Sequence, residues 1–529
     1  MKDYYSYIST KAAWDCTETI FLCAPAAYAE SPEKAAEYAE LSGWKNTAEQ
    51  HAAVLIVPVT ENGYRDMDVS WIPDFYDVHK NDFRAPGGVS IPGRDGVLWL
   101  WETMIYLAGY EEGADYAANV LTAHPGFFAA SLLHNGKITD YSHADEEAAH
   151  WFVRKPHDYA CTNREIPSAV WLSGTVDPET RKYFETCAHT DTEAQVTYGG
   201  ICTEVHCCSG NPAQQIRISA DMPSSDTVMD TFFGHTLRWK NSPDGQLRNY
   251  LGKNDYASSE RFVHYCAQAN GNDYPYTVYL PAGMTKDEAK GLPVVFSIHG
   301  RGEPSWVFAE KNGWQVLADE TKEFITVFPD SPYNIWLIDR DRDSLKEIAA
   351  QVVKNYKADL ERIYLSGFSN GAVFTSQQAS TFPECFAAAS PWNGPAMSMR
   401  IDRYIYADTF AESGYEMPFW IIVGDSDSKA SADREDELDI ILPANHCERS
   451  SEEVWNGENH YTEQAGYMEG NRFHTRVFRN TEGSVRAGLT VMKNMPHGAV
   501  WDESRAAWAF MKRFRRPAGS KTVEEITEE

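Results

Sequence analysis

The chain has 529 residues, of which 43% are hydrophobic and 23% are charged, and its formal net charge at pH 7 is −30. A field of that sign repels nucleic acid and anionic membranes, so neither is expected as a partner. The sequence contains no stretch of 18 apolar residues that would predict a membrane span. Its length is sufficient for two domains, each with a core of its own.

The first predicted element is a buried strand followed by a loop, in "IFLCAPAAYAES" (20–31). This segment imitates a signal peptide, but Asp15 and Glu18 precede it, where a signal peptide carries positive charge. We therefore expect a cytoplasmic protein, with secretion left open. The ten cysteines have no regular spacing, and free thiols are the simplest expectation. The cluster "CTEVHCC" (202–208) lacks a second ligand pair at zinc spacing, so no metal site is predicted.

A long repeat links the two halves of the chain. "YLAGYEEGADYAANVLTAHPGFFAASLLHNG" (106–136) aligns without a gap to "YLSGFSNGAVFTSQQASTFPECFAAASPWNG" (364–394), an offset of 258 residues (364 minus 106). Eleven of the 31 positions are identical, where average composition gives roughly two. The shared glycines permit a tight turn from strand to helix, and the shared Phe-Ala-Ala suits a buried strand.

Three further pairs of segments recur in the same order, which indicates a duplicated domain rather than a solenoid of small units. The predicted domains are residues 1–250 and 251–529, because the polar, turn-rich stretch near 245–260 is typical of a boundary. The recurring pairs are 43–58 with 313–329, 166–178 with 417–428, and 221–226 with 494–499.

Strands and helices alternate in the second half. This alternation predicts an α/β fold with a mostly parallel sheet and helices on both faces. The expected strands are 275–281, 292–300, 324–330, 362–367, 385–394 and 419–425. The expected helices are 306–322, 341–357, 370–381 and 502–514.

A candidate nucleophile lies in "RIYLSGFSNGAVF" (362–374), which has the form strand, G-x-S-x-G, helix. Gly367 and Gly371 permit the sharp turn that displays the Ser369 hydroxyl at the carboxyl edge of the sheet. The backbone N–H of Asn370 is then positioned to donate to a developing oxyanion. The strand "VVFSIHG" ends in a loop where the N–H of Arg301 or of Gly302 is the natural second donor.

The serine needs a base and an orienting carboxylate, which follow it in the chain order Ser, Asp, His. His497 lies between the last strand and the last helix, and is the predicted base. Asp425 and Asp427 both follow the strand "FWIIVG", and the first half keeps Asp177 at the position of Asp427. Asp427 is therefore favoured, with Asp425 as the alternative.

Three larger side chains stand near the predicted strand ends. Trp336 and Trp392 would either wall an apolar or aromatic acyl pocket or belong to the core. His299 would either contact substrate or support the hinge of its loop. The chemistry requires no metal and no organic cofactor.

These motifs, with "FPECFAAASPWNG", "GDSD" and "MPHG", make residues 265–515 resemble the poly(3-hydroxybutyrate) depolymerases, feruloyl esterases and related carboxylesterases of the α/β-hydrolase superfamily. The resemblance implies a Ser369–Asp427–His497 triad and hydrolysis of a carboxylic ester through an acyl-enzyme. It implies a small or oligomeric ester as substrate, and a monomer or a homodimer. With the repeat, it predicts a tandem α/β-hydrolase fold.

The first half departs from this pattern at its catalytic positions. Glu111 replaces the serine, Ser224 replaces the histidine, and "CAP" (23–25) replaces "IHG" (298–300). We therefore expect an inactive copy. The alternatives are a serine peptidase or amidase with the same triad, a non-catalytic binding protein, and an acid–base role for Glu111.

Overall fold

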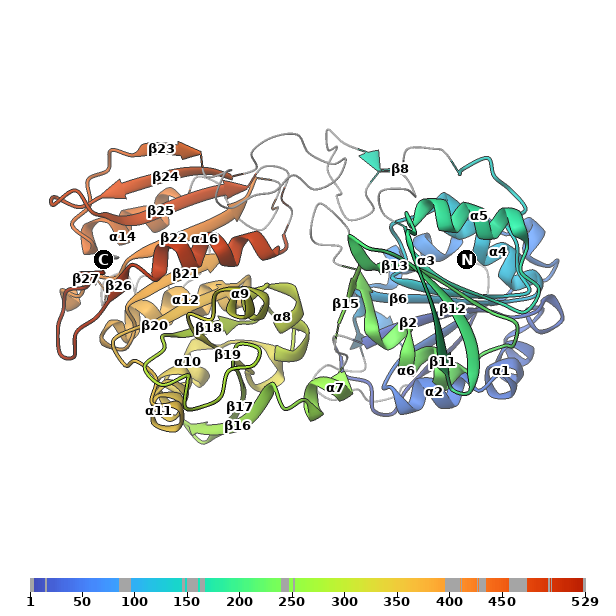
Figure 1. Cartoon of the computed structure of the whole chain (residues 1–529), viewed down its shortest axis with the longest axis horizontal. Helices are drawn as coiled ribbons and strands as arrows, with labels where there is room; N and C mark the ends of the chain where they lie inside the picture. The colour runs from blue at the N-terminus through green and yellow to red at the C-terminus, as the bar shows by residue number, and fades with distance from the viewer. Residues whose placement is uncertain are drawn as a thin grey trace. The chain divides into compact units, whose positions relative to one another are not determined.

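The computed structural model describes residues 4–526 apart from 15–16, 85–96, 145–147, 150–159, 162–166, 239–246, 251–252, 395–409, 411, 426, 428–433, 456–472, 493–494 and 496. The chain divides into two compact units (Figure 1). Unit 1 comprises Met1–Gly252, and unit 2 begins at Lys253. No helix within the described ranges is long and apolar enough to cross a membrane.

Unit 1 is built on a nine-stranded sheet with the order β1-β3-β2-β6-β7-β10-β13-β12-β11. The six strands from β3 to β13 run parallel, while β1 at one edge and β12 and β11 at the other run antiparallel to their neighbours. The strands are β1 (Tyr4–Ile8), β2 (Thr17–Cys23), β3 (Val54–Pro58), β6 (Leu100–Tyr110), β7 (Ala130–His134), β10 (Ala169–Ser173), β11 (Thr192–Tyr198), β12 (Ile201–Cys208) and β13 (Asn211–Ser219). The helices that concern us are α1 (Pro32–Leu41), α2 (Trp44–Gln50), α4 (Glu112–Ala123), α5 (Pro178–Cys187) and α6 (Ser225–Thr231).

Unit 2 is built on a ten-stranded sheet with the order β16-β17-β19-β18-β20-β21-β22-β25-β24-β23. The strands are β16 (Phe262–Ala269), β17 (Asn272–Tyr279), β18 (Val294–Ile298), β19 (Ile325–Pro329), β20 (Ile363–Phe368), β21 (Ala388–Trp392), β22 (Phe419–Gly424), β23 (Glu452–Trp455), β24 (Phe473–Arg479) and β25 (Val485–Met492). The helices are α7 (Lys253–Ser258), α8 (Ser305–Lys311), α9 (Trp314–Thr321), α10 (Ile338–Asp341), α11 (Ser344–Tyr356), α12 (Asn370–Thr381), α14 (Glu435–Ala444) and α16 (Trp501–Met511).

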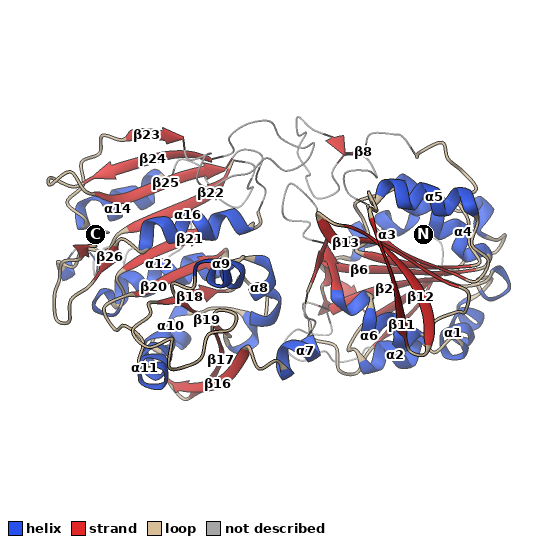
Figure 2. Ribbon diagram, viewed as in Figure 1, coloured by secondary structure: helices blue, strands red, loops and turns tan. Residues whose placement is uncertain are grey.

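The two sheets correspond strand for strand once β16 is set aside. Taken in order, β17, β19, β18, β20, β21, β22, β25, β24 and β23 have the same parallel and antiparallel neighbours as the nine strands of unit 1. Helices lie on both faces of each sheet (Figure 2). The predicted tandem α/β-hydrolase fold with mostly parallel sheets is confirmed.

A pair of buried arginines extends the correspondence beyond the sheets. Arg238 Nε donates to the carbonyl of Phe128 at 3.1 Å, and Arg516 Nε donates to that of Phe386 at 2.9 Å. Phe128 and Phe386 are aligned, identical positions of the long repeat. Both arginines are buried, and burying a guanidinium is costly unless such acceptors are present.

Two helix predictions need correction. The stretch expected as one helix over 306–322 forms α8 and α9, because Gly313 between them is left-handed at φ 71°. A side chain at Gly313 would meet Trp501 of α16 at 2.7 Å, so the break is set by packing. The helix expected over 341–357 is α11, preceded by the short α10. The antiparallel edge strands β23 and β24, like β11 and β12, were not expected.

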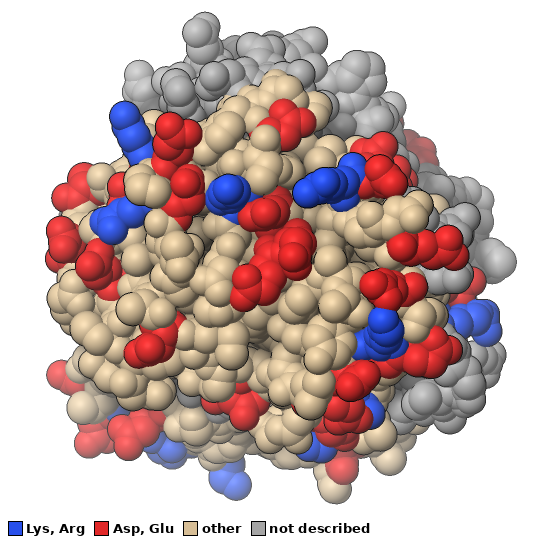
Figure 3. Space-filling model, turned by 90° about the vertical axis from the view of Figure 1, so that its right-hand side faces the viewer, with Lys and Arg blue, Asp and Glu red and all other residues tan. Residues whose placement is uncertain are grey.

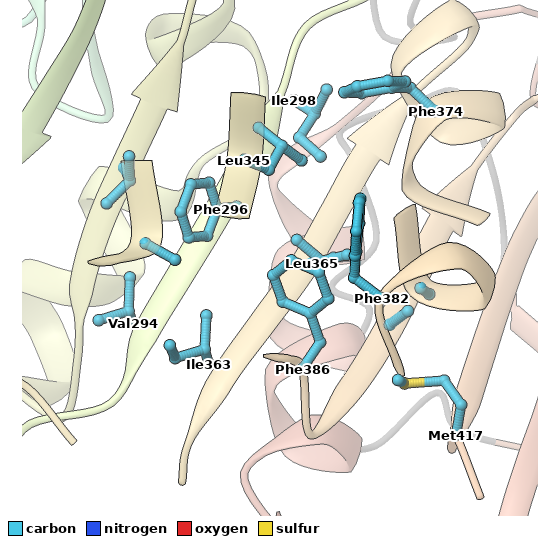
Figure 4. Packing of buried hydrophobic residues seen from close by; sticks show 14 of the residues in the cluster. Val294, Phe296, Ile298, Leu345, Ile363, Leu365, Phe374, Phe382, Phe386 and Met417 are labelled. Carbon is cyan, nitrogen blue, oxygen red and sulfur yellow. The ribbon is translucent and has the colours of Figure 1, made fainter. Parts of the chain in front are cut away.

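The core of unit 2 lies between its central strands and helices α11 and α12. Phe296 and Leu365 point from β18 and β20 into this cluster, and Leu345 and Phe374 reach it from the two helices (Figure 4). All four side chains are at most 1% exposed. Burial on this scale fixes the ends of β18 and β20, from which the candidate site is built.

The chain has an acidic excess, with 77 Asp and Glu against 47 Lys and Arg. On the face drawn in Figure 3, acidic side chains are scattered with basic ones among them rather than gathered in one patch. Eight of the ten cysteines are free thiols, and Cys16 lies outside the described ranges. Cys202, Cys207 and Cys208 lie on strand β12.

Candidate active site

Ser369 forms the turn between β20 and α12. Its backbone has φ 54° and ψ −116°, a strained conformation for a residue with a side chain. Gly371 holds the first turn of α12 so close to β18 that a side chain there would overlap the carbonyl oxygens of Ile298 and His299. Gly367 is equally crowded by the backbone of Gly371. The two glycines therefore force the turn that displays the serine.

The structure brings Ser369, His497 and Asp427 into one hydrogen-bonded line. Ser369 Oγ lies 2.8 Å from His497 Nε2, and His497 Nδ1 lies 2.8 Å from Asp427 Oδ2. The Asp427 side chain is fully buried, and the imidazole is 16% exposed. Because a carboxylate accepts from Nδ1–H, Nε2 is left to accept the serine proton.

Asp427, rather than Asp425, is the carboxylate that contacts the histidine. Asp425 is exposed, and its backbone N–H donates to the carbonyl of Met492 at 3.0 Å. The two aspartates follow the same strand end, so the choice between them is made by the turn after β22.

Asn393 ties together two of the three segments that carry the predicted triad, a role that was missed from the sequence. Its Nδ2 donates to the carbonyl of Gly498 at 2.7 Å, next to His497, and its Oδ1 accepts the N–H of Gly424 at 2.6 Å. Asn393 has a left-handed backbone at φ 47°. The available signal was that Asn135 and Asn393 are identical positions of the repeat.

The predicted oxyanion donors divide into two groups. Asn370 begins α12, and its side chain makes two bonds to the backbone of Trp336, accepting from N–H at 2.7 Å and donating to C=O at 3.2 Å. The backbone N–H of Asn370 thus has a fixed position at the helix start. The N–H of Gly302, in contrast, donates to the carbonyl of Asn334 at 2.8 Å. Gly302 anchors its loop, which corrects its assignment as a donor and leaves Arg301 as the candidate.

Unit 1 shows what the amide at the Arg301 position binds. Gly113 packs on the carbonyls of Cys23 and Ala24 as Gly371 packs on those of Ile298 and His299, so Ala26 corresponds to Arg301. The N–H of Ala26 donates to the carboxylate of Glu112 at 3.3 Å. In unit 1 a carboxylate oxygen therefore accepts the hydrogen bond of this backbone N–H.

The remaining catalytic positions of unit 1 hold residues with structural partners. Ser224 caps α6 by accepting the N–H of Thr227 at 3.1 Å, and Asp177 caps α5 by accepting that of Thr180 at 2.9 Å. The carboxylate of Glu111 accepts from Asn135 Nδ2 at 2.8 Å. A hydrogen-bonded line like that of Ser369, His497 and Asp427 is not seen among these residues.

The two tryptophans assigned to substrate are core residues. Trp336 is 1% exposed, stacks on Phe374 with 4.6 Å between ring centroids, and donates through Nε1 to the carbonyl of His299 at 3.1 Å. Trp392 is fully buried and stacks on Trp314 at 5.8 Å. Because both rings are buried, the interpretation as core residues replaces the substrate assignment.

His299 is fully buried and supports the oxyanion loop instead of facing substrate. Its Nε2 accepts the N–H of Ser331 at 3.2 Å, so the proton is on Nδ1, which donates to the carbonyl of Gly300 at 2.6 Å. Burial lowers the pKa of His299 below its ordinary value of 6.5, which keeps the ring neutral. His299 is thus a structural residue of the site.

No family model matches the chain. It is 32% identical over 122 residues to the bifunctional acetylxylan esterase/xylanase XynS20E of Neocallimastix patriciarum, a match that covers 22% of this chain and 17% of that protein. It is 28% identical over 130 residues to poly(3-hydroxyalkanoate) depolymerase C of Paucimonas lemoignei, covering 22% of this chain and 30% of that one. Among solved structures, an acetyl xylan esterase from Aspergillus awamori matches 47% of this chain and 99% of its own, with 15% identity and a TM-score of 0.38.

Proposed function

We propose that this chain, an α/β-hydrolase related to serine esterases, hydrolyses a carboxylic ester through an acyl-enzyme formed on Ser369. One observation carries the proposal. The line from Ser369 Oγ through the His497 ring to Asp427 is continuous, with both distances at 2.8 Å, and it starts from a strained strand-to-helix turn. Strain of this kind persists where the surrounding structure requires it, and it clusters at active sites.

The proposed reaction has two steps. Ser369 Oγ attacks the ester carbonyl while His497 Nε2 takes the hydroxyl proton, and the collapsing intermediate expels the alcohol, which receives that proton. Asp427 stabilises the imidazolium that forms between the two transfers. Water, deprotonated by the same nitrogen, then attacks the acyl-enzyme, and the imidazolium returns the proton to Ser369 Oγ as the acid leaves. The backbone N–H groups of Asn370 and Arg301 stabilise the oxyanion in both steps.

The proposed substrate is an ester with a short acyl group, with an acetyl ester as the first candidate. The support comes from the relatives, whose names specify acetylxylan and poly(3-hydroxyalkanoate) as what they act on. The chain spans less than a third of the length of either relative, so their substrates serve here as the basis of a proposal only. Feruloyl esters, implied by the resemblance of the motifs, are the second candidate.

Unit 1 is proposed to be a non-catalytic copy of the same fold. It shares the strand order of unit 2, while its catalytic positions hold Glu111 and the helix caps Ser224 and Asp177. A carboxylate also occupies the amide of Ala26, where an oxyanion would bind. The proposed domains are residues 1–250 and 251–529.

The test is a panel of acetyl, short-chain acyl, feruloyl and hydroxyalkanoate esters, with an amide matched to the best ester. Wild-type protein should hydrolyse at least one ester, and a fluorophosphonate should label Ser369. Ser369→Ala should lose both, with a fall in kcat of about 10⁴-fold or more. Faster turnover of the amide would favour a peptidase or amidase. An unlabelled Ser369 in folded protein would favour a binding protein.

A further inference from the structure

We propose that the buried ion pair of Glu303 and Lys311 is a positioning device that aims the oxyanion donor of Arg301. The inference rests on the proposed esterase function, and it assigns a role to two residues outside the proposed triad. Lys311 Nζ donates to Glu303 Oε1, and the two side chains are 2% and 4% exposed.

A buried ion pair is weak evidence for stability, because removing two charges from water costs about as much as their attraction returns. Glu303 lies in the loop between β18 and α8, and Lys311 ends α8. Apolar side chains would fill this space without the cost of removing two charges from water. The position of the pair therefore suggests a requirement other than stability.

The requirement is found at Gly300, which the carboxylate holds by its N–H and whose C=O shares a peptide with the N–H of Arg301. Glu303 Oε2 accepts the N–H of Gly300 at 3.3 Å, and the N–H of Glu303 donates to the carbonyl of Gly300 at 3.4 Å. The same carbonyl accepts from His299 Nδ1 at 2.6 Å. Because a trans peptide is planar, a fixed carbonyl of Gly300 also fixes the direction of the Arg301 N–H.

The fit around Gly300 is tight. A β-carbon at this position would lie 2.8 Å from Glu303 Oε2 and 3.0 Å from the Phe368 ring. The carboxylate thus packs directly on the backbone that it orients. Lys311 holds the second carboxylate oxygen, so that Oε2 remains directed at Gly300.

Lys311 also contacts Phe368, a residue that packs against His497, the proposed base. Its Nζ lies 4.0 Å from the centroid of the Phe368 ring, within the range of a cation–π contact. The Phe368 ring packs against the His497 ring, with 5.0 Å between centroids. One ammonium group therefore supports the loop that carries Arg301 and the ring that flanks His497.

The variants Glu303→Gln and Lys311→Met, alone and combined, test this proposal with the best ester of the panel. Each single variant should lower kcat by about 10- to 100-fold, since a donor displaced by a fraction of an ångström loses much of its effect. KM should stay within about twofold, because the oxyanion exists only in the transition state. The double variant should lose little more than the worse single variant, since both residues act through one peptide.

The matched control is Arg362→Met. Arg362 pairs with Asp359 at 2.6 Å at the amino end of β20, the end opposite Ser369. This variant should keep its kcat. Every rate is divided by the concentration of folded protein, measured by thermal unfolding and by titration of reactive serine with a fluorophosphonate. Lys311→Arg keeps the cation and should therefore lose less kcat than Lys311→Met.

Two results would overturn the proposal. One is a kcat per titrated site that is unchanged in Glu303→Gln, the variant closest in shape to the native residue. The other is a loss of rate that appears in KM alone. Failure of the proposed function is distinct from either, since Ser369→Ala would then keep the wild-type rate.

Discussion

Glu111 and Ser369 have nearly the same backbone conformation, with φ 51° and ψ −122° for Glu111 and φ 54° and ψ −116° for Ser369. One is the proposed nucleophile, and the other is a glutamate whose carboxylate bonds to Asn135. The turn is therefore set by its surroundings, above all by Gly113 and Gly371, whichever side chain it carries. Strain alone does not identify a working site here.

Asp427→Asn is expected to lower kcat by about 10³- to 10⁴-fold, since an amide favours the wrong tautomer of His497. Labelling of Ser369 by a fluorophosphonate should slow in parallel. Asp425→Asn is the matched control and should keep its kcat, because Asp425 follows the same strand but is exposed. Equal losses in the two variants would contradict the assignment of Asp427.

Gly371→Ala is expected to lower the free energy of unfolding by at least about 2 kcal/mol and to abolish activity, because the new β-carbon overlaps backbone oxygens that cannot move aside. Gly113→Ala meets the same obstacle in unit 1, at the carbonyls of Cys23 and Ala24. It should destabilise the protein similarly while leaving kcat per folded molecule unchanged. Thermal unfolding and titrated activity measure both effects, and a Gly113→Ala protein that is folded but inactive would refute the non-catalytic role of unit 1.

Glu111 is expected to be dispensable for hydrolysis. Glu111→Ala and Glu111→Gly both remove the carboxylate and should keep the wild-type kcat. They differ only in a β-carbon at φ 51°, so the glycine variant should be more stable by about 1–2 kcal/mol. Denaturant unfolding measures this difference. A marked loss of activity in both variants would instead give Glu111 an acid–base role.

Stability should decline in mild acid. Burial lowers the pKa of His299, His124 and His134 below 6.5, so each takes up a proton more readily in the unfolded chain. As pH falls below about 6.5, protonation therefore favours unfolding, while above pH 7 these groups contribute no pH dependence. Melting temperatures between pH 8 and 5 measure the effect.

In this series His299→Gln should show a shallower decline than wild type. An unchanged decline in His299→Gln would mean that this ring does not contribute.

The bounds of strands and helices were predicted best where residues adjacent in the sequence determine them. The strand expected at 362–367 is β20 (Ile363–Phe368), and the helix expected at 370–381 is α12 with the same bounds. The glycines of the turn mark where the strand ends and where the helix begins. The mostly parallel sheet with helices on both faces followed from the alternation of strands and helices. The edge strands β23 and β24 were missed, since their direction is set by pairing with β25 and not by a local pattern.

Within the site, several roles could not be read from the sequence because they depend on burial or on contacts between residues that are not adjacent in the chain. The N–H of Gly302 meets the carbonyl of Asn334, 32 residues later in the chain (334 minus 302), and the spacing of a loop gives no sign of this. Trp392 ends a strand, as a substrate residue would, but its ring stacks on Trp314 within the core. The ion pair of Glu303 and Lys311 spans one helix, and only the burial of both side chains distinguishes it from an ordinary surface pair.

The hydrogen bond from the amide of Ala26 to the carboxylate of Glu112 would make the proposed loss of chemistry in unit 1 hard to reverse. A single change of Glu111 to serine would restore a hydroxyl at the turn, but the amide opposite would already be occupied. Ser224 and Asp177 would still be engaged in capping helices, and replacing them would weaken the fold before any rate was gained. A second active site in unit 1 would thus require several substitutions together, some of which would destabilise the fold.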